Sequence, residues 1–190
     1  KHISPRPHDG PRHTWPHPTA RILYSLQEHT SMVDLFAIDP TDGTTLHHLT
    51  GVKIIPADQD PKDYWADEVR LSPGPHPRHL YASTRGLTAA TRGYVAVFAL
   101  DPADGTLASD TALHIWQTPT SGGIANAIEP APRADDDTGV EYLAMTDSEE
   151  GWVFMLGFDP RKGEIGEVAR VNLGKTGEGE VVKAATAVWL

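Results

Sequence analysis

Arg12, Glu28 and Arg85 have the side-chain types and positions to act on an anionic substrate. Arg12 stands in a Gly-Pro-Arg-His turn where a strand is expected to begin, and Arg85 directly follows an expected strand over 80–84. From there both side chains could reach a shared channel, where guanidinium groups bind carboxylates by charge-assisted hydrogen bonds. Glu28 ends the next strand, and beside two cations it would stay charged, as a base or an arginine-orienting partner. Spacing alone, however, favours surface arginines paired with turn aspartates.

The connection over residues 118–137 supplies further candidates, Ser121 and Asn126. Its Pro, Gly and Asp content, like that of the connection over 51–65, argues against regular structure. The backbone N–H groups of residues 121–123 and the Asn126 amide could bind a carboxylate or a lactone oxygen. A loop at the mouth of a channel and a plain surface loop fit this composition equally well, as does a structural role for Asn126.

The composition excludes several other classes of site. The 190 residues carry 16 Lys and Arg against 26 Asp and Glu, and the net charge of −10 would repel nucleic acid. The lack of cysteine excludes a thiol nucleophile and a zinc ribbon within the chain. No apolar run approaches the roughly 18 residues that a membrane span needs. The ten histidines form no compact ligand set, and no nucleotide-binding motif occurs, so we expect neither a metal nor a cofactor.

Three segments of the chain, over residues 21–49, 78–116 and 141–173, share one layout. Each has two short apolar strands, an Asp-Pro-x-x-Gly turn and a third strand. The paired strands are expected at 22–26 and 32–38, at 80–83 and 94–100, and at 142–146 and 151–158. The turns begin at Asp39, Asp101 and Asp159, at spacings of 62 and 58 residues. In each turn Pro presets its own φ and Gly supplies a positive φ, which predicts a hairpin.

This repeat predicts an all-β fold, a β-propeller of four-stranded antiparallel blades joined by long loops. No segment keeps a 3.6-residue apolar period, so we expect almost no helix. Blades are expected near 12–55, 66–117 and 124–174, with 175–190 as a closing strand, all within one domain over 1–190. That amounts to about three and a half blades. A small β-sandwich complete in itself is the less favoured alternative.

The stretch HDGPRHTWPHPTARILYSLQE resembles the lactonase family of seven-bladed propellers. The segments ADEVRLSP, TPTSGG and AMTDSEEGW, with a terminal AVW, extend the resemblance over essentially the whole chain. Within the family the chain is more similar to the fungal carboxymuconate cyclases than to the 6-phosphogluconolactonases, and it matches the C-terminal half. Arg12 and Arg85 match arginines of the fungal pattern, and Glu28 matches the family's strand-end Glu. The resemblance therefore reverses the preference for surface arginines.

The resemblance implies a cofactor-free intramolecular addition on a small anionic substrate. A carboxylate of a muconate-like polycarboxylate would attack a conjugated double bond, and a proton would be delivered to the neighbouring carbon. The implied catalytic residues are Arg12, Glu28 and Arg85, and the implied substrate-binding residues are His13, Glu68, Ser121 and Asn126.

Three points of this assignment stay open. The proton donor of the fungal pattern is a histidine upstream of this half, and His13 is the local substitute. Fungal members have a bulky aromatic residue at position 13 where bacterial relatives carry His, so the exact substrate is not fixed. Glu68 matches bacterial relatives and Asp67 fits the fungal pattern better, and the sequence does not choose between them.

An open half-propeller would expose unpaired strand edges, so we expect a partner that completes the ring. It would be the N-terminal half, on a second chain of a cleaved precursor or in a segment outside this one, or a symmetry mate in a homo-oligomer. The chain lacks an initial Met and a signal peptide, as if it began inside a longer protein, and the resemblance favours the cytoplasm. Two other functions stay open: lactone hydrolysis of the 6-phosphogluconolactonase type and non-catalytic binding by a propeller.

Overall fold

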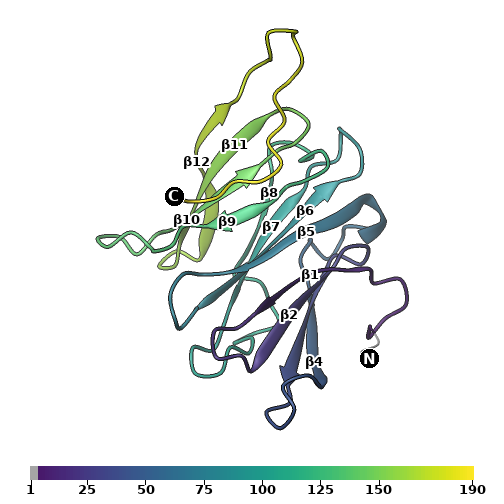
Figure 1. Cartoon of the computed structure of the whole chain (residues 1–190), viewed down its shortest axis with the longest axis vertical. Coiled ribbons are helices and arrows are strands. Elements are labelled where there is room, and N and C mark those ends of the chain that lie inside the picture. The colour runs from purple at the N-terminus through teal and green to yellow at the C-terminus, as the bar shows by residue number, and fades with distance from the viewer. Residues whose placement is uncertain (1–3) are drawn as a thin grey trace.

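Residues 4–190, which the computed structural model describes, form three four-stranded antiparallel sheets and no α-helix (Figure 1). The first sheet contains β1 (Pro11–Pro16), β2 (Ile22–Gln27), β3 (Met32–Ile38) and β4 (Leu46–Lys53). The second contains β5 (Tyr64–Leu71), β6 (His79–Gly86), β7 (Tyr94–Ala99) and β8 (His114–Gln117). The third contains β9 (Ile128–Pro130), β10 (Glu141–Thr146), β11 (Trp152–Asp159) and β12 (Glu164–Asn172). Strands pair in chain order, which confirms the predicted all-β fold of propeller-like blades. One 3-10 turn, Pro61–Asp63, precedes β5.

The three Asp-Pro-x-x-Gly turns fold alike, each between the third and fourth strands of its sheet. The N–H of Gly43, Gly105 and Gly163 donates to the carbonyl of the first Asp of its turn at 2.8, 2.8 and 2.9 Å. These glycines have φ of +66°, +82° and +69°, a region that costs other residues energy. The turn residues therefore fix the hairpin geometry, as their order predicted.

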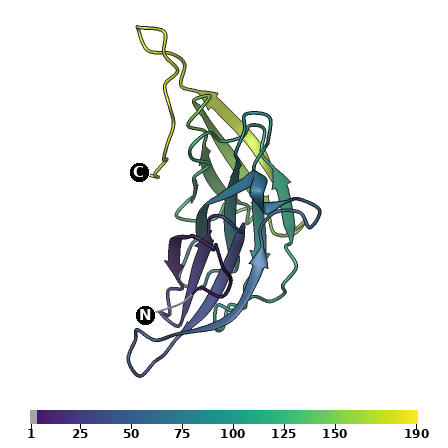
Figure 2. The ribbon, with the colours of Figure 1, turned by 90° about the vertical axis from the view of Figure 1, so that its right-hand side faces the viewer.

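The core lies between the sheets, because alternate side chains of a strand point to opposite faces. In the middle sheet Leu80 and Ala82 pack toward the first sheet, while Tyr81 packs toward the third. All eight residues of β6 are buried. Figures 1 and 2 show the sheets following one another along the long axis of the molecule. Their first strands lie at one inner edge, where β5 contacts both β1 and β9.

The C-terminal segment 175–190 forms no strand within the part of the chain described, and its pairing as a closing strand stays a prediction. Its ladder contacts are limited to an isolated bridge between Lys175 and Val181. Two hydrogen bonds hold the segment against the third sheet. The Thr146 hydroxyl of β10 donates to the carbonyl of Ala185, and the Trp189 indole N–H donates to the carbonyl of Glu129 in β9. A strand requires backbone hydrogen bonds along a neighbouring edge, and residues 175–190 make none with the strands of the third sheet in the part of the chain described. No helix in that part has the length and apolar character to cross a membrane.

Candidate active site

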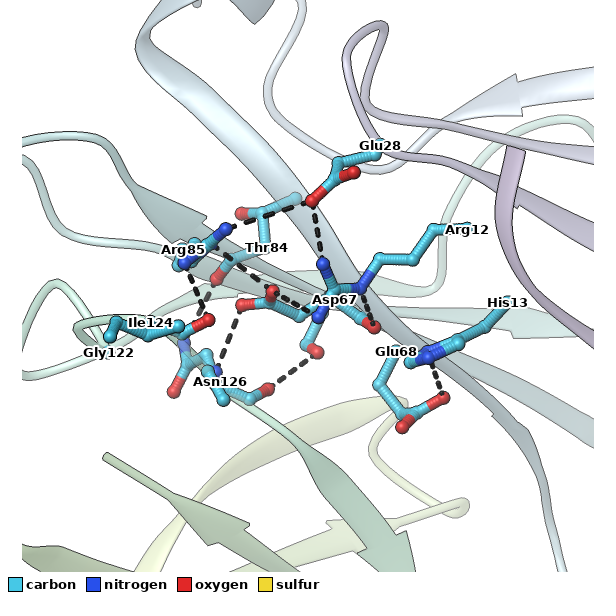
Figure 3. A network of polar contacts seen from close by, with 12 residues as sticks. Arg12, His13, Glu28, Asp67, Glu68, Thr84, Arg85, Gly122, Ile124 and Asn126 are labelled. Atoms are coloured by element: carbon cyan, nitrogen blue, oxygen red, sulfur yellow. Dashed lines mark hydrogen bonds and ion pairs between the residues drawn. The ribbon is translucent and has the colours of Figure 1, made fainter. Parts of the chain in front are cut away.

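Arg12 and Arg85 converge on the same two carboxylates from neighbouring blades (Figure 3). Arg12 Nη1 lies 2.7 Å and Arg85 Nη2 lies 3.7 Å from Oε1 of Glu28. Arg12 Nη2 and Arg85 Nε lie 3.7 and 3.3 Å from Oδ1 of Asp67. The predicted Arg12, Glu28 and Arg85 therefore come together, with Asp67 between the two guanidinium groups. We call these four residues the arginine–carboxylate cluster.

Two β-bulges bring the cluster together. In β1, Pro11 pairs with Gln27 and Thr14 with Ser25, so Arg12 and His13 stand opposite a single residue of β2. In β5, Ala66 pairs with Thr84 and Glu68 with Ser83, so Asp67 is the extra residue. A bulge bends its strand and re-aims the side chain of the extra residue, here at the inner edge of two adjacent sheets. Between Asp67 and Glu68, the structure places Asp67 in the cluster.

Asp67 is the most buried member of the cluster. Its side chain is 1% exposed, against 9% for Arg85, 19% for Glu28 and 28% for Arg12. Its Oδ2 accepts a hydrogen bond of 2.9 Å from the Asn126 N–H, whereas Oδ1 accepts none from the described residues. Desolvation raises the pKa of Asp67 to about 7, against the lowering effect of Arg85, the Asn126 N–H and Arg12. Desolvation is the largest cause, so this carboxyl group is poised to titrate near neutral pH.

Arg85 is also held by two carbonyl oxygens and an aromatic ring. Its Nη1 donates to the carbonyl oxygens of Ile124 at 2.5 Å and Gly123 at 3.3 Å. Its guanidinium carbon lies 4.9 Å from the ring centre of Trp65, a cation–π distance. The loop over 121–126 therefore turns two carbonyl oxygens toward Arg85, and binding of an anion by the N–H groups of this loop stays a prediction.

Ser121 and Asn126 support the cluster from behind. Asn126 is fully buried, and its Nδ2 donates to the carbonyl of Thr84 at 2.9 Å. Ser121 is buried, and its carbonyl accepts from the Gly86 N–H at 3.0 Å. These contacts fit the structural interpretation of Asn126, whose backbone positions Asp67. Substrate binding by either side chain stays a prediction.

His13 and Glu68 form a second polar group beside the cluster (Figure 3). His13 Nδ1 lies 3.0 Å from Glu68 Oε1, and Glu68 also forms an ion pair with Arg70. Arg70 lies over the ring of Trp15 at 4.3 Å. The predicted site thus divides into two neighbouring groups. The arginine–carboxylate cluster contains two arginines, whereas Glu68 in the second group is paired with one arginine, Arg70.

The cluster adjoins an open cavity of about 500 Å³ between the first and second sheets. His8, His29, Lys62 and Trp65 contribute to its wall. Two of its lining residues contact the cluster: Trp65 lies against Arg85, and His29 Nε2 lies 3.9 Å from Glu28 Oε2. The four cluster residues themselves do not line the cavity.

This arrangement suits carboxylate chemistry. Two guanidinium groups can bind a carboxylate and stabilise negative charge that develops beside it. Glu28 is accessible and can orient both arginines or exchange a proton with a bound molecule. Across residues 4–190 no group of three potential metal ligands gathers around one point.

Sequence reasoning missed two contributions. Trp65 is not among the candidate residues, yet its ring centre lies 4.9 Å from the guanidinium carbon of Arg85. The second contribution is that of the Gly123 and Ile124 carbonyl oxygens, which accept hydrogen bonds from Arg85. The signal that could have pointed to Trp65 is its position, at the start of an inner strand and two residues before Asp67.

The comparison of sequences gives fungal muconate-transforming enzymes as relatives. The chain is 47% identical to muconate cycloisomerase 1 of Cutaneotrichosporon cutaneum, over 100% of the chain and 48% of that protein. It is 32% identical to carboxy-cis,cis-muconate cyclase of Neurospora crassa, over 98% of the chain and 48% of that protein. The chain therefore spans about half the length of these relatives.

Solved structures with the same fold include bacterial propellers. The periplasmic gluconolactonase PpgL of Pseudomonas aeruginosa matches with a TM-score of 0.68 and 22% identity, over 90% of the chain and 42% of that structure. A putative 6-phosphogluconolactonase of Bacteroides fragilis matches with a TM-score of 0.67 and 23% identity, over 90% and 41%. At such identities the likeness shows the fold alone. The profile of the family described as lactonase, seven-bladed β-propeller, matches residues 1–170. The chain belongs to the lactonase family of seven-bladed β-propellers.

Proposed function

We propose that this chain supplies the anion-binding part of an active site that converts a carboxymuconate-like polycarboxylate into a lactone. The observation that carries the proposal is the convergence of Arg12 and Arg85, from two blades, on one oxygen of Glu28. Two cations held this close suit a substrate with several carboxylates, despite the net charge of −10 of the chain. The names of the two fungal relatives support the substrate class.

In the proposed reaction a carboxylate oxygen of the substrate attacks a carbon of its own conjugated double bond. A C–O bond forms, the π electron pair moves to the neighbouring carbon, and that carbon takes up one proton. Arg12 and Arg85 bind a substrate carboxylate and stabilise the enolate-like charge that develops on it. Glu28 orients both guanidinium groups and is the accessible carboxylate for proton exchange.

The remaining blades are part of the proposal. The outer face of β12 exposes Val168 by 58% and Val171 by 56%, which is the kind of apolar surface that a following blade covers. We propose that the partner is the rest of the ring, on this chain's precursor, on a second chain or on another copy. Those blades would supply the residues that face Arg12 and Arg85 across the channel, including a proton donor.

The test is turnover of 3-carboxy-cis,cis-muconate by the purified protein assembled with the remaining blades of its ring, followed as loss of the diene absorbance. Arg12→Ala and Arg85→Ala should each lower kcat/KM by about 10²- to 10³-fold, the effect of removing one stabilising contact to a developing charge. Arg161→Ala is the matched control, because Arg161 is an exposed turn residue whose partner among residues 4–190 is Asp159.

Three results would count against the proposal. No loss of diene absorbance at high concentration of the protein assembled with the remaining blades would exclude this substrate. Opening of a δ-lactone instead would favour a hydrolase. Full turnover by Arg85→Ala would show that the cluster is not the site, and binding without turnover by the wild type would favour a non-catalytic propeller.

A further inference from the structure

Asp67 is placed where its charge decides the net charge of the anion-binding cluster. With Asp67 ionised, Arg12 and Arg85 face two carboxylates and the four charges cancel. With Asp67 protonated, the same two guanidinium groups face Glu28 alone and the cluster carries one positive charge. Because Asp67 is 1% exposed, water screens this change poorly.

The groups around Asp67 come from four segments. Arg12 reaches it from β1, Arg85 from β6 and Glu28 from the end of β2, and the loop over 121–126 contributes the Asn126 N–H. Only Oδ2 accepts a hydrogen bond from the described residues, while Oδ1 lies near both guanidinium groups without hydrogen-bond geometry. The site therefore leaves one oxygen free to carry a proton.

We propose that Asp67 takes up a proton when an anionic ligand binds to Arg12 and Arg85. This inference rests on the proposed function, because it takes the cluster as the binding site for a substrate carboxylate. Asp67 acts here as a positioning residue, since its burial keeps it from touching the ligand.

The physical reason is the competition between two anions for the same cations. A carboxylate bound at the exposed side of Arg12 and Arg85 adds negative charge beside Asp67 and shares the cations that favour its ionised form. Before binding, burial already raises the pKa of Asp67 to about 7, so a further rise takes up a proton at neutral pH. Linkage then requires the reverse as well: raising the pH through this range weakens anion binding.

Proton uptake on binding is measured by isothermal titration calorimetry of the purified protein in buffers of different ionisation enthalpy. The probe is tricarballylate, a tricarboxylate without a double bond, which cannot be turned over. If binding raises the pKa of Asp67 by one unit, uptake at pH 7.5 is about half a proton per site. Under the same assumption the affinity at pH 9 is about eightfold weaker than at pH 6.

The Asp67→Asn variant separates Asp67 from other titrating groups, because the amide resembles the protonated acid. It should bind tricarballylate without that uptake, with nearly the same affinity at pH 6 and pH 9. His29→Gln is the matched control, since His29 Nε2 lies 3.9 Å from Glu28 Oε2 and the substitution alters the edge of the cluster while leaving Asp67 in place. This control should keep the uptake.

The outcomes separate the two proposals. Failure of the wild type to bind tricarballylate would overturn the anion site and with it the proposed function. Binding without proton uptake, or uptake that persists in Asp67→Asn or vanishes in His29→Gln, would overturn only the role of Asp67. If Asp67→Asn does not fold, infrared difference spectra of the wild type with ¹³C-labelled tricarballylate decide. A new carboxylic acid band from the protein supports the inference, and its absence refutes it.

Discussion

Asp67→Asn should change how the stability of the protein depends on pH. In the native state burial raises the pKa of Asp67 to about 7, whereas its ordinary value is 3.8. Between pH 3.8 and about pH 7 the native state therefore binds more protons than the unfolded state does. The contribution of Asp67 to stability is fully present below pH 3.8. It is lost as the pH rises through about 7.

The size of the effect follows from the shift. About three pKa units at 1.4 kcal/mol each give roughly 4 kcal/mol, lost in the wild type between pH 4 and pH 8. In Asp67→Asn this loss is absent, because the amide does not titrate. The free energy of unfolding of the variant minus that of the wild type should therefore be about 4 kcal/mol higher at pH 8 than at pH 4.

The assay is urea unfolding of both proteins in a pH series, with the free energy of unfolding taken at each pH. The difference between the two proteins cancels every other titrating group that the substitution leaves unchanged. A difference that is constant across the series would show that Asp67 has an ordinary pKa. A variant that loses stability relative to the wild type as the pH rises would show that the two arginines outweigh desolvation, which would refute the reasoning.

Four further substitutions test the fold by urea unfolding. Gly105→Ala should destabilise by about 2–4 kcal/mol, because its φ is +82° and the added Cβ would lie 2.6 Å from the His17 ring. Gly43→Ala, at the same turn position with +66° and open space, should lose only about 1 kcal/mol; equal losses would contradict the role of His17. Glu141→Ala should cost about 3 kcal/mol, since it leaves His79 and the Tyr81 hydroxyl without their buried partner, and a loss below 1 kcal/mol would speak against that network. Tyr24→Phe should cost about 1–2 kcal/mol, because the hydroxyl donates to the Gly105 carbonyl across two blades, and an unchanged midpoint would contradict this.

The blades could be predicted because their determinants are local. The order Asp, Pro, Gly fixes a turn within five residues, and alternating apolar residues fix which face of a strand is buried. The expected strand over 32–38 coincides with β3, and the expected strand over 142–146 differs from β10 by one residue. The closing strand over 175–190 stays a prediction, because such a strand depends on an edge that no local pattern contains.

The site could be predicted only in part. Arg12, Glu28 and Arg85 are at strand ends, so topology brings them near one another. The position of Asp67 depends on a bulge in β5. The alternation of residue types along a strand does not show where a bulge occurs. Its burial and titration depend on packing between blades, which is a long-range property. The sequence therefore named the two arginines and left Asp67 and Glu68 undecided.

The most direct test of the account is the position of a bound tricarboxylate in a crystal of the protein soaked or grown with tricarballylate. We predict one carboxylate of the ligand within hydrogen-bond distance of the guanidinium groups of both Arg12 and Arg85, beside Glu28. A ligand bound away from these two arginines, with Arg12 and Arg85 still paired to Glu28 and Asp67, would contradict the account.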